Sequence, residues 1–142
     1  MATVDLVQDF SCSVEQLYDY LTVHENLSII FAPAKVTRIK EGSDMPNGLG
    51  SVRKLSLPLV PSFEETVTLN QPNERVEYRI SGGFTPLKNH IGVMRFSSTP
   101  QGSRLHYTIN FDGKLPLIAP VVGFGLTQGI RRGLKTLSKT LV

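Results

Sequence analysis

The residues best suited to chemistry are Arg53, Glu65, Tyr78 and His90, because all four are expected on the otherwise apolar face of one predicted sheet. The planar guanidinium of Arg53 suits an anionic or carbonyl oxygen, which Glu65 would help to orient. His90 and Tyr78 are candidates for acid and base on an enolisable carbonyl, provided that their surroundings tune their pKa values. The competing interpretations are a structural ion pair for Arg53 and Glu65 and a hydrogen-bonded core pair for Tyr78 and His90.

Other reactive residues lack the partners that chemistry would need. Cys12 precedes an expected helix start, but no histidine can be placed beside it as a base. His24, His90 and His106 do not have the spacing of metal ligands. The glycines around Gly50 precede a strand rather than a helix, so they are not a dinucleotide fingerprint. We therefore expect no metal, no cofactor and no cysteine nucleophile.

Composition limits the kinds of partner. The 142 residues are 40% hydrophobic and 19% charged, which is typical of one globular domain. The net charge is +3, and the basic residues are scattered, with Arg131, Arg132 and Lys135 the only dense group, which argues against nucleic-acid binding. The single cysteine and the absence of a signal-like start predict a cytoplasmic protein. The apolar stretch Leu115 to Leu126 is short and contains proline and glycine, so no stable membrane insertion is expected.

Hydrophobic periodicity predicts a strand and short helices at the start of the chain. Residues Thr3 to Phe10 alternate between apolar and polar, as in a half-buried strand. Ser13 and Gln16 make a capping-box pattern, so a short amphipathic helix is expected to follow. A second turn of helix is expected from Glu25 to Ile30.

The remainder predicts six more strands and a long helix. Turn sequences GSDMPNG, LPLVP, NQPNE, GGFTP and STPQG divide Lys35 to Asp112 into consecutive strands. Everything after Leu117 is expected to be helical, with an apolar stripe opposite a basic face. The economical arrangement is an α+β fold in which a curved, seven-stranded antiparallel sheet wraps around the C-terminal helix, with residues 1–142 forming a single domain.

The turns also predict the register of the sheet. Cross-strand partners share a face, so Arg53 is expected opposite Glu65 and Val67 opposite Tyr78. A turn centred on Phe84 would place Tyr78 opposite His90. Further expected pairs are Leu55 with Phe63, Met94 with Tyr107, and Phe96 with Leu105. The concave face would then carry Arg53, Leu55, Phe63, Glu65, Val67, Leu69, Val76, Tyr78, Ile80, His90, Met94, Phe96, Leu105, Tyr107, Ile109 and Phe111.

Glycines in the C-terminal helix suggest that this face is incompletely filled. Gly123, Gly125, Gly129 and Gly133 each lower helix propensity by about 1 kcal/mol relative to alanine. Such glycines suit either close backbone approach or space beneath the helix. The residues expected to bind a ligand there are Arg53, Leu55, Phe63, Glu65, Val67, Tyr78, His90, Met94, Phe96, Tyr107, Ile109, Leu126 and Ile130.

An ordered set of short motifs resembles a known family. The set comprises GLGSVR ending at Arg53, the glutamate Glu65, the Val-x-Tyr ending at Tyr78, and the His-x-Gly that begins at His90. With the long C-terminal helix, it resembles the START-like (SRPBCC, helix-grip, Bet v 1-like) superfamily, in its bacterial polyketide cyclase/dehydrase and lipid-transport branch. The resemblance implies a hydrophobic cavity between sheet and helix, which different members use for lipids, sterols, polyketides, plant hormones or protein partners.

Three functions follow as expectations. The first is binding of a lipid, polyketide or aromatic molecule by a carrier or sensor. The second is an aromatase or cyclase-type enzyme that uses His90, Tyr78, Arg53 and Glu65. The third is an interaction module in which Leu115 to Leu126 and the helix contact a protein partner or a second copy, so a homodimer is allowed.

Overall fold

The computed structural model describes all residues from 1 to 142 and contains one seven-stranded antiparallel sheet. The strand order is β1-β7-β6-β5-β4-β3-β2, so β2 to β7 form the expected meander and β1 pairs with β7. The strands are β1 (Ala2–Phe10), β2 (Lys35–Lys40), β3 (Val52–Ser56), β4 (Phe63–Gln71), β5 (Arg75–Gly83), β6 (Leu87–Thr99) and β7 (Gly102–Gly113). The helices are α1 (Val14–Thr22), the 3₁₀ helix η1 (His24–Ile29) and α2 (Ile118–Thr140). The predicted fold class is confirmed.

Helix α1 begins where the sequence predicts it. The Ser13 side chain accepts a hydrogen bond from the backbone N–H of Gln16, and the Gln16 side chain accepts one from the backbone N–H of Ser13. These two bonds satisfy backbone donors that the first turn of a helix leaves free. The helix therefore starts at a fixed point after β1 and places Leu17 and Leu21 in the core.

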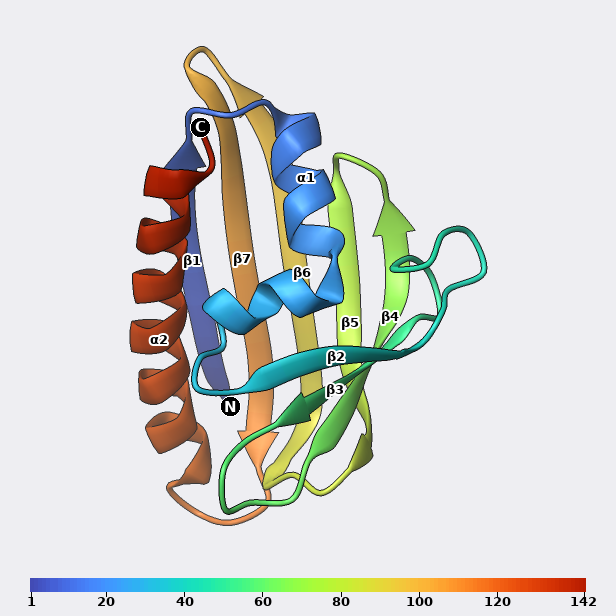
Figure 1. Ribbon diagram of the computed structural model, residues 1–142. Coiled ribbons are helices and arrows are strands. Elements are labelled where there is room, and N and C mark those ends of the chain that lie inside the picture. Colours follow the sequence, from blue (N-terminus) through green and yellow to red (C-terminus); the bar gives the residue numbers. More distant parts are fainter.

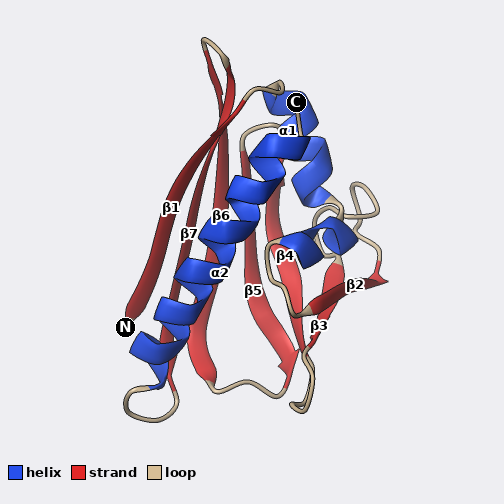
Figure 2. Cartoon of the chain, turned by 60° about the vertical axis from the view of Figure 1, so that its left-hand side comes forward, coloured by secondary structure: helices blue, strands red, loops and turns tan.

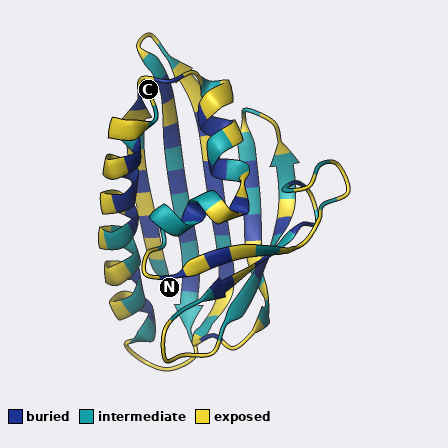
Figure 3. Ribbon diagram, in the orientation of Figure 1, coloured by how far each residue is buried: buried dark blue, intermediate teal, exposed yellow.

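The sheet is strongly bent, and the helices lie on its concave side (Figure 1). Helix α2 crosses in front of the strands (Figure 2), packing mainly on β1 and β7. Buried residues alternate along the strands, and in α2 they follow one side of the helix (Figure 3). The core lies between the sheet and the helices. No helix in the structure has the length and apolar character needed to cross a membrane.

The register agrees with the sequence prediction at five of six cross-strand pairs. Arg53 pairs with Glu65, Leu55 with Phe63, Val67 with Tyr78, Met94 with Tyr107, and Phe96 with Leu105. The sixth prediction is wrong.

Tyr78 pairs with Gly92 rather than with His90. The pairing of β5 with β6 is centred on Thr85 rather than on Phe84, so the partner of Tyr78 lies two positions further along β6. The last ladder pair is Tyr78–Gly92, and beyond it the backbone N–H of Ile80 donates to Nδ1 of His90 at 3.1 Å.

The predicted concave position of Leu69 is also wrong. A register shift between Val67 and Leu69 inserts an extra residue into β4, so Leu69 pairs with Glu77 on the outer face. Such a bulge reverses the alternation of the residues that follow it. Asn70 therefore points to the concave side, where its side-chain oxygen accepts a hydrogen bond from the hydroxyl of Tyr18.

Candidate functional site

A cavity of about 320 Å³ lies between the sheet and the first half of α2. Of the 21 residues that line it, 14 are hydrophobic. Its walls come from strands β3 to β7, from α2, and from the connections between η1 and β2, between β3 and β4, and between β5 and β6. A cavity of this size and character is suited to a small apolar molecule.

The structure brings eight of the thirteen expected ligand-binding residues to the cavity wall. These are Leu55, Phe63, Glu65, Tyr78, His90, Ile109, Leu126 and Ile130. Val67, Met94, Phe96 and Tyr107 lie outside this wall in the packed core, and Arg53 lies behind Glu65 and Tyr78.

Thirteen further wall residues were not proposed from the sequence. They are Ile30, Phe31, Ala32, Pro33, Ala34, Leu57, Ile80, Thr85, Pro86, Leu87, Val122, Gly125 and Gly129. Many of them belong to connections, which carry no periodicity that would reveal their orientation. For the three residues of α2 in this group, the glycines and the apolar stripe of the helix were the features of the sequence that indicated a cavity wall.

The glycines of α2 divide into two groups. A Cβ at Gly133 would lie 2.7 Å from the backbone oxygen of Ile29, so this glycine allows η1 to approach the helix closely. A Cβ at Gly123 would lie 3.3 Å from Ala2. By contrast, Gly125 and Gly129 line the cavity, and a Cβ at either one would meet nothing within 4 Å. Close approach and empty space therefore both occur along the same helix.

A buried ion pair lies next to the cavity. Nε of Arg53 donates to Oε1 of Glu65 at 2.8 Å, and both side chains are only 4% exposed. The guanidinium carbon lies 4.2 Å from the centre of the Tyr78 ring, close enough for a cation–π interaction. Burial alone would lower the pKa of Arg53, but the Glu65 carboxylate raises it above its ordinary value. Arg53 therefore remains a cation whose charge Glu65 offsets.

His24 is a second partner of Arg53, a role that the sequence did not reveal, whereas Nη2 of Arg53 is buried without a hydrogen-bond partner. Nη1 of Arg53 lies 3.4 Å from Nδ1 of His24, while Nε2 of His24 lies 2.8 Å from Oγ of the buried Ser51. Burial, followed by the charge of Arg53, lowers the pKa of His24 to about 3. A neutral imidazole can accept from Arg53 through Nδ1 and donate to Ser51 through Nε2. The contact could not be predicted from the sequence, because His24 and Arg53 are 29 residues apart and no turn joins their elements directly.

His90 reaches the cavity in a defined protonation state. Its Nδ1 accepts the backbone N–H of Ile80, so in the neutral ring the proton lies on Nε2. Burial lowers the pKa of His90, although the Glu65 carboxylate acts in the opposite direction. Nε2 lies 3.6 Å from Oε2 of Glu65, too far for a good hydrogen bond. His90 therefore presents a donor beside a carboxylate oxygen that makes no hydrogen bond within the protein.

Tyr78 is held by its neighbours and is poorly suited to act as a base. Its hydroxyl is hydrogen-bonded to the hydroxyl of Tyr107. Burial raises the pKa of both phenols, with the Tyr107 hydroxyl adding to the effect on Tyr78. Gly92 makes room for the ring, because a Cβ at this position would overlap it. Tyr78 thus forms an aromatic wall between Arg53 and the cavity.

The polar end of the cavity combines one hydrogen-bond acceptor with one donor. Oε2 of Glu65 accepts and Nε2 of His90 donates, and the remaining wall is mostly apolar. A hydroxyl group both donates and accepts, so it matches this pair. Arg53, in contrast, does not line the cavity. Its Nε and Nη1 contact Glu65 and His24, its guanidinium lies over the Tyr78 ring, and its Nη2 is buried without a hydrogen-bond partner.

Comparison with known families gives a match over the whole chain. The family model described as polyketide cyclase / dehydrase and lipid transport matches residues 1–142. No curated protein sequence matches this chain.

Solved structures show the same fold at low sequence identity. XoxI from Bacillus cereus has a TM-score of 0.71 and 19% identity, covering 99% of this chain and 96% of its own. A structure described as the Aha1 dimer from Colwellia psychrerythraea has a TM-score of 0.73 and 15% identity, covering 99% and 96%. Ara h 8.0201 has a TM-score of 0.68 and 18% identity, covering 97% of both chains. At these identities the likeness concerns the fold alone.

Proposed function

Because this chain belongs to the polyketide cyclase/dehydrase and lipid transport family of the START-like (SRPBCC) superfamily, we propose that it binds a hydrophobic small molecule beneath α2. The observation that carries the proposal is the 320 Å³ cavity with its largely hydrophobic wall. Gly125 and Gly129 support it, because their missing side chains leave the space open.

We further propose that the ligand carries a hydroxyl group at one end. Oε2 of Glu65 and Nε2 of His90 stand 3.6 Å apart at the polar end of the cavity. A ligand hydroxyl would donate to the carboxylate and accept from the imidazole. An anionic group would instead meet the Glu65 carboxylate, while Arg53 lies behind it. The apolar body of the ligand would lie along α2.

The first experiment asks whether the cavity is occupied. Freshly purified protein would be extracted with organic solvent and the extract examined by mass spectrometry. We expect a stoichiometric apolar molecule from the wild type and none from Gly129→Leu, whose side chain would grow into the cavity without a clash at Cβ. Gln128→Leu, on the exposed side of the same helix, is the matched control and should retain the molecule.

A second experiment tests the polar end with three ligands of similar shape. We expect 2-naphthol to bind more tightly than naphthalene, by roughly tenfold to hundredfold, because hydrogen bonds to charged groups contribute about 1.5–3 kcal/mol. The 2-naphthoate anion should bind most weakly. Titration calorimetry would measure the three affinities. Tightest binding of the anion would refute the assignment of Glu65 as the partner.

One feature favours a second candidate, an enzyme of the cyclase or dehydratase type. The Glu65 carboxylate lies beside the Nε2–H of His90 within an apolar cavity, so Glu65 would serve as the general base and His90 would donate a hydrogen bond to the substrate oxygen. If the protein is such an enzyme, His90→Gln would abolish turnover of a hydroxylated or enolisable substrate but change the affinity for that substrate only a few-fold. Equal loss of binding and turnover would favour the carrier function instead.

A further inference from the structure

Three connections meet at one end of the molecule, which we call the loop end: residues 57–62, 84–86 and 114–117. The backbone N–H of Phe84 donates to the oxygen of Ser62 at 3.2 Å, and that of Lys114 donates to the oxygen of Pro86 at 2.8 Å. The three connections are therefore joined side by side. They lie together at the lower end of the molecule in Figures 1 and 2.

The loop end and the first turns of α2 expose an unusual amount of apolar surface. Leu59 is fully exposed, and Leu117 and Phe84 are 76% and 66% exposed. Seven of the thirteen exposed large hydrophobic residues are in this region. The seven are Leu59, Val60, Phe84, Leu115, Leu117, Val121 and Phe124. Apolar side chains gathered in this way mark a surface that contacts something apolar.

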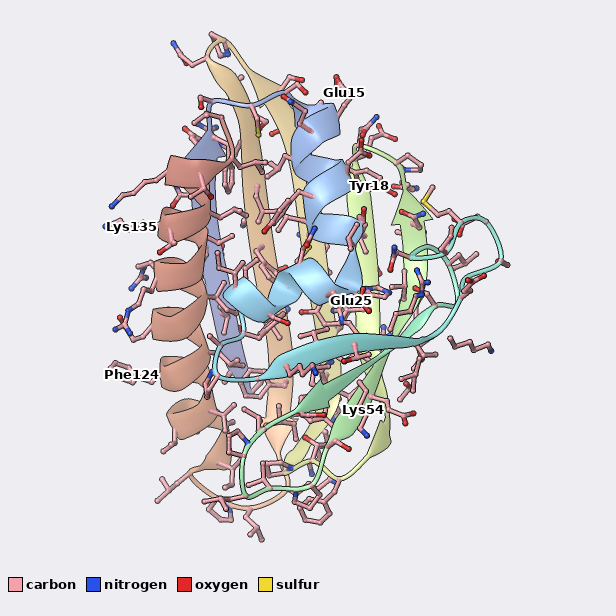
Figure 4. The ribbon with its side chains drawn as sticks, viewed as in Figure 1. Glu15, Tyr18, Glu25, Lys54, Phe124 and Lys135 are labelled. Carbon is pink, nitrogen blue, oxygen red and sulfur yellow. The ribbon has the colours of Figure 1, made fainter.

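Positive charge is concentrated on the same helix. From residue 113 to residue 142, the chain has five basic residues and no acidic one. The charge of this segment, +5, is therefore larger than the net charge of +3 of the whole protein. Lys114 precedes the helix, while Arg131, Arg132, Lys135 and Lys139 are exposed along its second half. In Figure 4 the side chains of Phe124 and Lys135 both point outward from α2. One face of the helix thus passes from apolar near the loop end to basic further along.

This combination fits an anionic lipid surface better than a second copy of the chain. Two copies meeting through this face would bring their basic residues together, which is unfavourable. Anionic headgroups would complement those residues, while the apolar loop tips enter the edge of the acyl region. The cavity also reaches this end, because Leu57, Thr85 and Pro86 belong both to the loops and to its wall.

We propose that the loop end and the outer face of α2 form a reversible docking surface for an anionic bilayer. The contact is peripheral, with the apolar tips anchoring and the basic residues held at the headgroups. Docking does not depend on the proposed ligand, but it would place the cavity next to the lipid from which an apolar ligand enters.

Vesicle flotation tests the proposal. The protein would be mixed with vesicles of phosphatidylcholine alone or of phosphatidylcholine with phosphatidylglycerol. We expect flotation with the anionic vesicles at low salt and a marked decrease at high salt, where charges are screened. Absence of the wild type from anionic vesicles at low salt would overturn the proposal.

Two sets of substitutions locate the surface. Each basic residue near an anionic surface strengthens binding about fivefold, so Arg131→Gln, Arg132→Gln and Lys135→Gln together should lower the partition coefficient about a hundredfold. The matched control, Lys35→Gln with Lys40→Gln, changes exposed basic residues on β2 and should have a much smaller effect.

The apolar set is Leu59→Asn, Phe84→Ser and Phe124→Ser, with Val7→Ser and Ile39→Ser as exposed apolar controls elsewhere. The first set should release the protein from vesicles, and the second should not. Circular dichroism would confirm that all variants fold.

Two further measurements separate this proposal from others. Gly129→Leu should abolish ligand binding but leave flotation unchanged, so failure of either proposal is recognised independently. Light scattering would reveal a dimer. A dimer that the apolar set dissociates, with no vesicle binding by the wild type, would assign this surface to self-association and overturn the proposal.

Discussion

Replacing Glu65 by glutamine should strongly destabilise the protein. Glutamine has the same shape and can still accept the hydrogen bond from Arg53, so the change removes mainly the negative charge. At 2.8 Å and an effective dielectric constant near 20, the attraction between the two charges is about 6 kcal/mol. Loss of one partner from a buried pair typically costs about 3–5 kcal/mol, because the other charge stays buried without compensation. That loss is a large part of the roughly 5–15 kcal/mol that stabilises a domain.

Urea denaturation followed by circular dichroism would measure the effect, since the chain has no tryptophan to serve as a fluorescent probe. With a slope of about 2 kcal/mol per molar urea, the midpoint should fall by roughly 2 M. The double variant Arg53→Met with Glu65→Gln contains no buried charge and should recover much of the loss. A control is Asp9→Asn, which breaks an ion pair at 2.6 Å whose side chains are about half exposed, and should shift the midpoint little.

The reasoning would be refuted by a Glu65→Gln variant as stable as the wild type. In that case Arg53 would have to be solvated by water rather than neutralised by Glu65. A double variant less stable than Glu65→Gln would also contradict it, because removal of the uncompensated charge should help.

Three further predictions concern packing and pH. Gly92→Ala should lower the free energy of unfolding, measured by heat or urea, by about 1–3 kcal/mol, because the new methyl group overlaps the Tyr78 ring. Unchanged stability would mean that the ring has room to move. Gly125→Ala should instead stabilise by up to about 1 kcal/mol, since its Cβ meets nothing and alanine favours the helix, and a lower melting temperature would contradict this. The lowered pKa values of His24 and His90 mean that the unfolded chain binds more protons below about pH 6.5, so stability should fall as the pH decreases from 7 towards 4. His24→Gln should flatten that slope by up to about 1.4 kcal/mol per pH unit, and an identical slope would show that His24 does not titrate on unfolding.

Most of the fold was predictable because its signals are local. Alternation along strands, the Ser13–Gln16 capping box and the apolar stripe of α2 each depend on residues within a few positions of one another. A short turn between two strands fixes which residues pair across them. The Arg53–Glu65 pair was therefore predictable even though the two residues are twelve positions apart.

Both errors are shifts of the strand register. An extra residue in β4 after Val67 reversed the orientation of Leu69. Centring of the β5–β6 pairing on Thr85 instead of Phe84 moved the partner of Tyr78 from His90 to Gly92. Alternation of residue types does not reveal an inserted residue, because the chain on either side still alternates.

The sequence by itself determined the elements, the family and the position of Arg53, Glu65 and His90 on the concave face. Only the tertiary structure decided which of those residues border empty space. Glu65 and His90 reach the cavity while Arg53 is enclosed by Glu65, His24 and Tyr78, and Gly125 opens onto space while Gly133 is pressed against η1. The physical reason is that a cavity is the volume left over when elements distant in sequence pack together, so no local pattern specifies it.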